Sequence, residues 1–169
     1  WSLRAIEHLC DTVKSWTGNI SERYYLYGHS AGAQFVHRLV LLLPEARYAR
    51  AIAANAGSYT MPTFAGHAYP YGLRGTPSTP EDITKVLGRD VGLLLGEQDT
   101  DPNHPDLNQA APAEEQGKHR LERGQTFYAT AQAVAGSLGV AFRWTLHTVP
   151  GAGHHQKDMV ESAVYWLLQ

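Results

Sequence analysis

The residues Gly28-His29-Ser30-Ala31-Gly32 place a serine between two glycines, with the spacing Gly-x-Ser-x-Gly. A serine hydroxyl is a weak nucleophile until a neighbouring base takes its proton. Residues 23–27 are β-prone and residues 33–43 have the composition of a helix. A strand, a sharp turn and a helix in this order would hold the Ser30 hydroxyl at the apex of the turn, clear of its own backbone.

The two flanking glycines suit such a turn. A nucleophile held in this way has a strained backbone, and we expect a side chain at Gly28 or at Gly32 to crowd the turn or the packing of the helix. The alternative is an ordinary turn in which Ser30 only caps the helix. Because so short a motif also arises by chance, the rest of the chain has to decide between the two interpretations.

A candidate acid and a candidate base follow later in the chain. Asp99 lies just past residues 91–95, an apolar run typical of a buried parallel strand, in the turn Gly96-Glu97-Gln98-Asp99. His154 follows a second expected strand, residues 140–149, and a glycine-rich turn. Imidazole titrates near neutral pH, so His154 is the candidate base for Ser30, and Asp99 would orient its ring.

Other residues compete for these two roles. Asp101 and Asp106 are also close to the end of the strand, but Asp99 comes soonest after it. His155 competes with His154 on the same turn. Any of the three aspartates could simply cap a turn.

The chain resembles the α/β-hydrolase serine esterases, including relatives of the polyester-depolymerase type. Residues 25–32, the turn Gly96-x-x-Asp99 and the turn Gly151-x-Gly153-His154 carry the resemblance, together with the chain order Ser, Asp, His; residues 54–59 look like the family's loop beside the nucleophile. The resemblance covers nearly the whole chain.

The resemblance implies hydrolysis of carboxylic esters through an acyl-enzyme. It also implies that the histidine directly after the glycine, His154, is the base and that the backbone N–H of Ala31 donates to the oxyanion. The fold hosts many chemistries, so the substrate stays open between small and polymeric esters. Cleavage of amides or thioesters by the same residues, or a binding module that has lost activity, are the alternatives.

The predicted elements alternate between strands and helices, which indicates one α/β domain over residues 1–169, with a mostly parallel sheet and helices on both faces. Four strands are expected, around Tyr25, Ile52, Leu94 and Trp144. The expected helices are residues 1–16 ended by Gly18, a short helix capped by Thr79 and Pro80, residues 115–138 closed by Gly139, and a last helix with the inner stripe Met159, Val160, Ala163, Val164 and Leu167.

The family's sheet has about eight strands, with the strand of the nucleophile near its middle. Only one helix precedes that strand in this chain. We therefore expect residues 1–169 to be the C-terminal portion of a larger hydrolase whose N-terminal strands are missing here. The missing N-terminal part would be its partner and would supply the second oxyanion donor, and the edge beside Tyr25 would be open.

Residues 57–79 show no clear period and are rich in glycine, proline, tyrosine and threonine. So long an irregular segment is usually functional, and we expect it to form a wall of the substrate site. Tyr59, with Tyr69 and Tyr71, and His29 beside the nucleophile are the candidate substrate-binding residues. The alternative for His29, and the expectation for His37 and His147, is that the ring packs or faces solvent.

The composition excludes other classes. The formal net charge is −2 with no basic run, so no nucleic-acid partner is predicted. No apolar stretch is long enough for a membrane span, and the single Cys10 excludes an internal disulfide. Asp99-x-Asp101-x-Asn103 starts like a calcium loop but lacks its later glycine and glutamate, so no metal and no cofactor are predicted. The compartment stays open.

Overall fold

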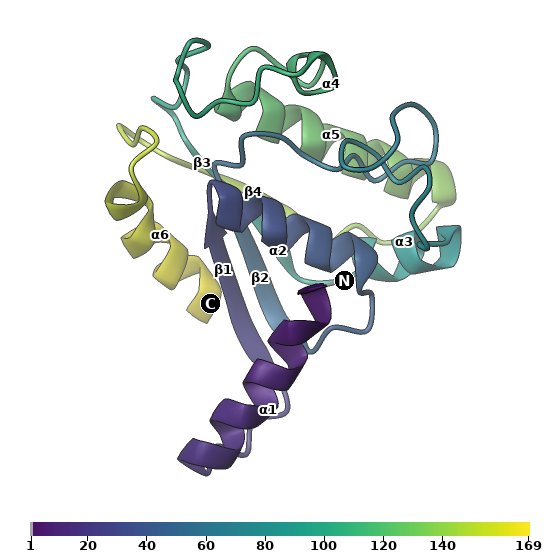
Figure 1. Ribbon diagram of the computed structural model, residues 1–169, viewed down its shortest axis with the longest axis vertical. Helices are drawn as coiled ribbons and strands as arrows, with labels where there is room; N and C mark the ends of the chain where they lie inside the picture. Colours follow the sequence, from purple (N-terminus) through teal and green to yellow (C-terminus); the bar gives the residue numbers. More distant parts are fainter. Residues whose placement is uncertain (1) are drawn as a thin grey trace.

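The computed structural model describes residues 2–169 (Figure 1). The elements alternate between helices and strands along the chain. They are η1 (Ser2–Arg4), α1 (Ala5–Thr17), β1 (Tyr24–His29), α2 (Ala31–Leu42), β2 (Tyr48–Ala54), α3 (Pro80–Leu87), β3 (Val91–Gly96), α4 (Ala111–Glu114), α5 (Arg120–Leu138), β4 (Thr145–Val149) and α6 (Gln156–Leu168).

The four strands form one parallel sheet in the order β1-β2-β3-β4, so the strand order follows the chain. Each connection crosses over through a helix, which is what parallel neighbours require. Because every strand runs the same way, the carboxyl ends of all four lie at one edge of the sheet. The loops that leave this edge carry Ser30, Asp99 and His154.

Helices cover both faces of the sheet, as the sequence predicts (Figure 1). Alternation along β2 shows the two faces: Ala51 and Ala53 pack into the core built with α2, α3 and α5, whereas Ile52 and Ala54 pack against α6. All six residues of β3 are buried, as expected of a strand covered on both sides. The predicted α/β class is therefore confirmed.

Three predicted helix ends are also confirmed, namely the start of α3 and the C-terminal ends of α1 and α5. Thr79 accepts a hydrogen bond from the Asp82 N–H while the Asp82 carboxylate accepts one from the Thr79 N–H, and Pro80 is the first residue of α3. Gly18 and Gly139 end α1 and α5 in the left-handed conformation, with φ of 68° and 65°.

Two predicted elements are shorter in the structure. The strand expected over residues 140–149 forms only as β4, because the Arg143 N–H donates to the Leu87 carbonyl and the Trp144 indole to the Val86 carbonyl. The helix expected over residues 115–138 begins at Arg120. Gly117, whose φ of 149° is not helical, interrupts the helical backbone before Arg120.

The inner stripe predicted for the last helix is only partly correct. Met159 and Ala163 are buried against the sheet, but Val160 and Val164 are 40% and 50% exposed. The buried face of α6 is therefore narrower than the apolar pattern suggests.

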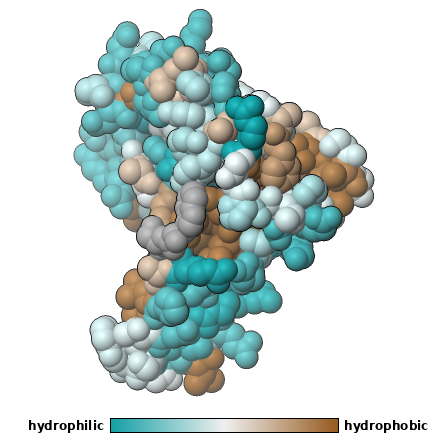
Figure 2. All heavy atoms as spheres, turned by 45° about the vertical axis from the view of Figure 1, so that its right-hand side comes forward, coloured by the Kyte–Doolittle hydropathy of each residue, from teal (hydrophilic) through white to brown (hydrophobic). Residues whose placement is uncertain are grey.

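In the described chain, the edge of the sheet at β1 is open, unlike its two faces, which helices cover. Among residues 2–169, β1 pairs with β2 alone, and Tyr25 in the middle of β1 is exposed. Apolar side chains are also exposed along α1 and the turn after it, at the projecting lower end in Figure 2; they are Leu9, Val13, Trp16 and Ile20. The open edge expected beside Tyr25 is thus confirmed. No helix in the described part of the chain is long and apolar enough to cross a membrane.

Candidate functional site

Ser30 lies at the turn between β1 and α2, with φ 55° and ψ −116°. A positive φ is uncommon for a residue with a side chain and marks local strain. The Ser30 N–H donates to the Ala54 carbonyl at 2.9 Å, which ties the turn to the end of β2. Ser30 occupies the N-cap position of α2, but its side chain makes no capping hydrogen bond there, so capping does not account for the hydroxyl.

The two glycines of the motif differ. A Cβ at Gly28 would lie 2.2 Å from the Gly32 carbonyl oxygen and 2.8 Å from the Val36 side chain, so only glycine fits there. A Cβ at Gly32 would meet no atom of the described chain within 4 Å. The expectation that a side chain at Gly32 would crowd the helix packing is therefore wrong for the contacts within this chain.

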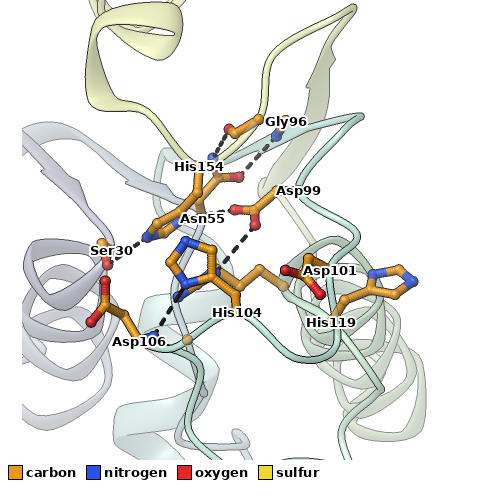
Figure 3. Close-up of polar contacts among 12 residues, drawn as sticks. Ser30, Asn55, Gly96, Asp99, Asp101, His104, Asp106, His119 and His154 are labelled. Carbon is orange, nitrogen blue, oxygen red and sulfur yellow. Dashed lines mark hydrogen bonds and ion pairs between the residues drawn. The ribbon is translucent and has the colours of Figure 1, made fainter.

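Ser30, His154 and Asp99 form a continuous chain of hydrogen bonds (Figure 3). The Ser30 Oγ lies 3.0 Å from the His154 Nε2, and the His154 Nδ1 lies 2.7 Å from the Asp99 Oδ2. With a proton on Nδ1, the imidazole donates to the carboxylate and leaves Nε2 free to accept the proton of the serine hydroxyl. The three side chains come from the carboxyl ends of β1, β3 and β4.

The competing residues lie elsewhere. Asp101 is exposed and its Oδ1 accepts the N–H of Asn103, and Asp106 is also exposed. His155 is the exposed residue before α6. The carboxylate that contacts an imidazole at this turn is that of Asp99, which is buried to 4% exposure.

Two more histidines surround His154. The ring of His29 lies 4.9 Å from it and the ring of His104 5.2 Å. Burial, aided by the nearby His154, lowers the pKa of His29 to about 4, so its imidazole is neutral at pH 7. The Nε2 of His29 is buried without a partner among the described residues. His29 therefore lies directly beside the candidate base.

A buried arginine supports the other oxygen of Asp99. Arg120, at the start of α5, is 1% exposed, and its Nη1 donates to the Asp99 Oδ1 at 3.3 Å. Its Nη2 lies 3.4 Å from the His104 Nδ1. A buried charge is costly unless it is paired, and here each of the two side chains is the ion-pair partner of the other.

Tyr59 does not lie where the sequence prediction placed it. Its ring has no exposed surface and stacks on Phe127 at 4.5 Å, because residues 54–60 continue from β2 into the core. Tyr59 therefore offers no face to a substrate in this structure, and its assignment as a substrate-binding residue is corrected. Residues 57–79 are otherwise irregular, as predicted.

His37 anchors the start of this irregular segment. Its Nδ1 donates to the Ala33 carbonyl, and its Nε2 accepts the N–H of Thr60 at 2.9 Å. Complete burial lowers the pKa of His37 to about 3, so it packs as a neutral ring. Tyr71 lies further along the segment, where its hydroxyl accepts a hydrogen bond from Asn108.

Solved structures similar to this chain are hydrolases by name. Poly(aspartic acid) hydrolase-1 from Sphingomonas sp. KT-1 matches with a TM-score of 0.97 and 44% identity, over 100% of this chain and 64% of its own. The poly(3-hydroxybutyrate) depolymerase LpqC from Bordetella parapertussis matches with a TM-score of 0.90 and 35% identity, over 98% and 56%. The chain has the α/β-hydrolase fold of these depolymerase-like proteins.

The chain thus spans less than two thirds of the length of each of these two proteins. A more distant match, the siderophore hydrolase EstB from Aspergillus nidulans, has a TM-score of 0.51 and 15% identity and supports the fold alone. Neither a protein-family model nor a curated protein matches the chain.

Three residues at this α/β-hydrolase site were missed from the sequence. Arg120 carries no spacing that relates it to Asp99, and only the packing of α5 brings it there; His104 lies on the same loop as Asp99, but its sequence spacing gave no signal. Asn55 had a signal, since it directly follows a strand that ends beside the nucleophile turn. Among the described residues, no group of three or more His, Cys, Asp or Glu side chains is placed to hold a metal ion.

Proposed function

We propose that the chain is the catalytic part of a serine hydrolase that cleaves carboxylic esters. Ser30 is the nucleophile, His154 the general base and Asp99 the residue that orients the imidazole. The observation that carries this proposal is the Ser30–His154–Asp99 chain of hydrogen bonds, 3.0 Å and 2.7 Å long, at a strained turn.

The reaction has two halves. Ser30 Oγ attacks the ester carbonyl carbon while His154 Nε2 takes its proton, and collapse of the tetrahedral intermediate breaks the carbon–oxygen bond to the alcohol. His154 gives its proton to the leaving alkoxide, which leaves an acyl-enzyme on Ser30. Water then repeats the sequence with His154 as base, releasing the acid and the free serine.

Ala31 supplies one donor to the oxyanion. It is the first residue of α2, where backbone N–H groups have no partner within the helix and the helix dipole favours negative charge. We propose that the second donor, and the neighbour of the β1 edge, come from the rest of the same hydrolase. The greater length of the two similar hydrolases and the exposed apolar side chains beside β1 support this.

The substrate is proposed to be a polymeric ester, by analogy with the depolymerase at 35% identity. His29, beside His154, and residues 57–79 without Tyr59 are the proposed substrate contacts. Cleavage of an amide is the second candidate, because the neighbour at 44% identity is a poly(aspartic acid) hydrolase, and amide bonds join the units of that polymer.

Labelling with a fluorophosphonate tests the proposal. The probe reacts with an activated serine, so the chain should label stoichiometrically and Ser30→Ala should not label at all. Loss of the serine of a triad costs on the order of a million-fold in turnover. Ser2→Ala is the matched control and should label fully; labelling that survives in Ser30→Ala contradicts the assignment.

Hydrolysis assays on two polymers separate the ester and amide candidates. Release of acid from poly(3-hydroxybutyrate) without release from poly(aspartic acid) supports the esterase, and the reverse supports the amidase. In both cases Ser30→Ala should abolish release. The role of Ser30 as nucleophile is therefore tested separately from the choice of substrate.

A further inference from the structure

Asn55 follows β2 directly and is completely buried. Its backbone has φ 52°, the left-handed region that asparagine tolerates better than most residues. A strained, buried polar residue persists only where its surroundings hold it, and such residues gather at functional sites. No step of the reaction above uses Asn55.

The side-chain amide of Asn55 joins the two loops that carry the acid and the base. Its Oδ1 accepts the N–H of Gly96 at 2.8 Å, at the end of β3 and three residues before Asp99. Its Nδ2 donates to the carbonyl of Gly153 at 3.2 Å, the residue before His154. Figure 3 shows Asn55 between the Gly96 turn and His154.

The backbone beside Asn55 reaches the nucleophile as well. The carbonyl of Ala54 accepts the N–H of Ser30 at 2.9 Å, and the N–H of Asn55 donates to the Leu94 carbonyl on β3 at 3.2 Å. Two consecutive residues at the end of β2 therefore hold the segments of all three proposed catalytic residues.

We propose that Asn55 is a positioning residue, which sets the distance between the acid turn at Asp99 and the histidine loop at His154. This inference rests on the proposed function of Ser30. The position needs an acceptor for Gly96 and a donor for Gly153 on one short side chain, and a primary amide supplies both. A displacement of about 1 Å in a reacting group costs roughly 100-fold in rate.

Asn55→Gly is the first test, because glycine keeps the positive φ without strain and removes both side-chain bonds. We expect kcat on an activated ester to fall about 100-fold with KM little changed. We also expect the far-downfield proton resonance of the His154 Nδ1–H to weaken or broaden, and this readout does not depend on turnover.

Asn55→Asp gives a pH signature that a loss of packing would not give. A protonated carboxyl has the same acceptor and donor as the amide, whereas a carboxylate has no donor and repels the Gly153 carbonyl. The ionisable groups on the elements around position 55 are Asp99 with Arg120, His154 with His29 and His104, Arg123 at the Gly57 carbonyl, and Glu97 and His155 on the acid and histidine loops. Burial and the two neighbouring carboxylates disfavour ionisation, so the variant should work at lower pH and lose activity as pH rises.

Trp144→Phe is the matched control. It loses one buried side-chain hydrogen bond to the backbone, from the indole to the Val86 carbonyl, at the opposite end of the strands. It should lower the melting temperature while leaving kcat, the pH profile and the downfield resonance as they are.

The outcomes separate this inference from the proposed function. Wild-type kcat and an unchanged resonance in folded Asn55→Gly, or a pH profile of Asn55→Asp parallel to that of the wild type, overturn the role of Asn55. If Asn55→Gly does not fold, Asn55→Asp alone decides through its pH profile. A wild-type chain that shows the resonance but reacts with no fluorophosphonate overturns the proposed function, while the resonance still tests Asn55.

Discussion

The carboxyl ends of the strands and the side beside β1 are held in different ways. At the carboxyl ends, buried polar groups cross-link the loops: Asn55 joins two turns, Arg120 pairs with Asp99, and His37 bridges α2 to the segment after β2. Beside β1, the partly buried Glu7 of α1 bonds to Tyr24 and Arg47, but large apolar side chains such as Trp16 and Ile20 are 78% and 92% exposed.

This difference shows what the described chain supplies by itself. The relative positions of serine, histidine and carboxylate come from bonds between β1, β2, β3 and the loop after β4, all of them present here. An exposed strand edge with apolar neighbours is instead the feature that natural proteins cover. The two regions can therefore be disturbed separately.

Asp99→Asn should have the largest effect. The amide keeps the shape of the side chain but favours the wrong tautomer of His154, and such a change costs about 10,000-fold in kcat. Turnover of an activated ester measures it. Asp101→Asn, at the exposed aspartate two residues later, is the control and should keep its activity; equal losses in both variants would contradict the chosen acid.

Tyr59→Ala should act on stability, because the ring is fully buried against Phe127. The expected loss is about 3–5 kcal/mol in the free energy of unfolding, measured by urea denaturation. Tyr59→Phe keeps the ring contacts and should cost far less. A change in ester preference without a change in stability would return Tyr59 to the substrate site.

Restoring the β1 side should raise turnover. The part of the Sphingomonas hydrolase that this chain does not match can be fused to it. If that part supplies the second oxyanion donor, kcat should rise roughly 100- to 1000-fold, and solubility should rise too. The same fusion carrying Ser30→Ala should gain solubility alone. Unchanged turnover and solubility would count against a completing segment.

Acid should lower the stability of the fold through His37, one of the buried polar groups near the carboxyl ends of the strands. Its pKa is about 3 when folded against an ordinary 6.5, so between these values the unfolded chain binds a proton that the folded chain does not. The free energy of unfolding should therefore fall with falling pH from about 6.5 toward 3, by up to about 1.4 kcal/mol per pH unit. His37→Gln should remove this part of the slope; identical slopes in the two proteins would show that His37 titrates normally.

Local chemistry explains which predictions were correct. The strand, turn and helix around Ser30 follow from neighbouring residues alone, and so do the glycine ends of α1 and α5. The position of Asp99 and His154 beside Ser30 could be predicted because parallel strands bring their carboxyl ends together, whatever the distance along the chain.

The predictions that were wrong depend on contacts between residues distant in the sequence. Tyr59 has the composition of a surface loop, but its backbone continues into the core, and only Phe127, 68 positions later, shows this. Residues 140–144 are β-prone, yet their polar groups bond to the end of α3. The pairing of Arg120 with Asp99 depends on where α5 begins. Because of the non-helical backbone at Gly117, α5 begins later than predicted.

The positive φ of Ser30 has a consequence for selection on this chain. A residue with a side chain in such a conformation costs about 1–3 kcal/mol, and glycine relieves that cost. Ser30→Gly should therefore make the protein harder to melt while it abolishes turnover. A screen that rewards heat resistance alone would favour loss of the proposed nucleophile, so thermostable descendants of this chain have to be selected on activity and melting together.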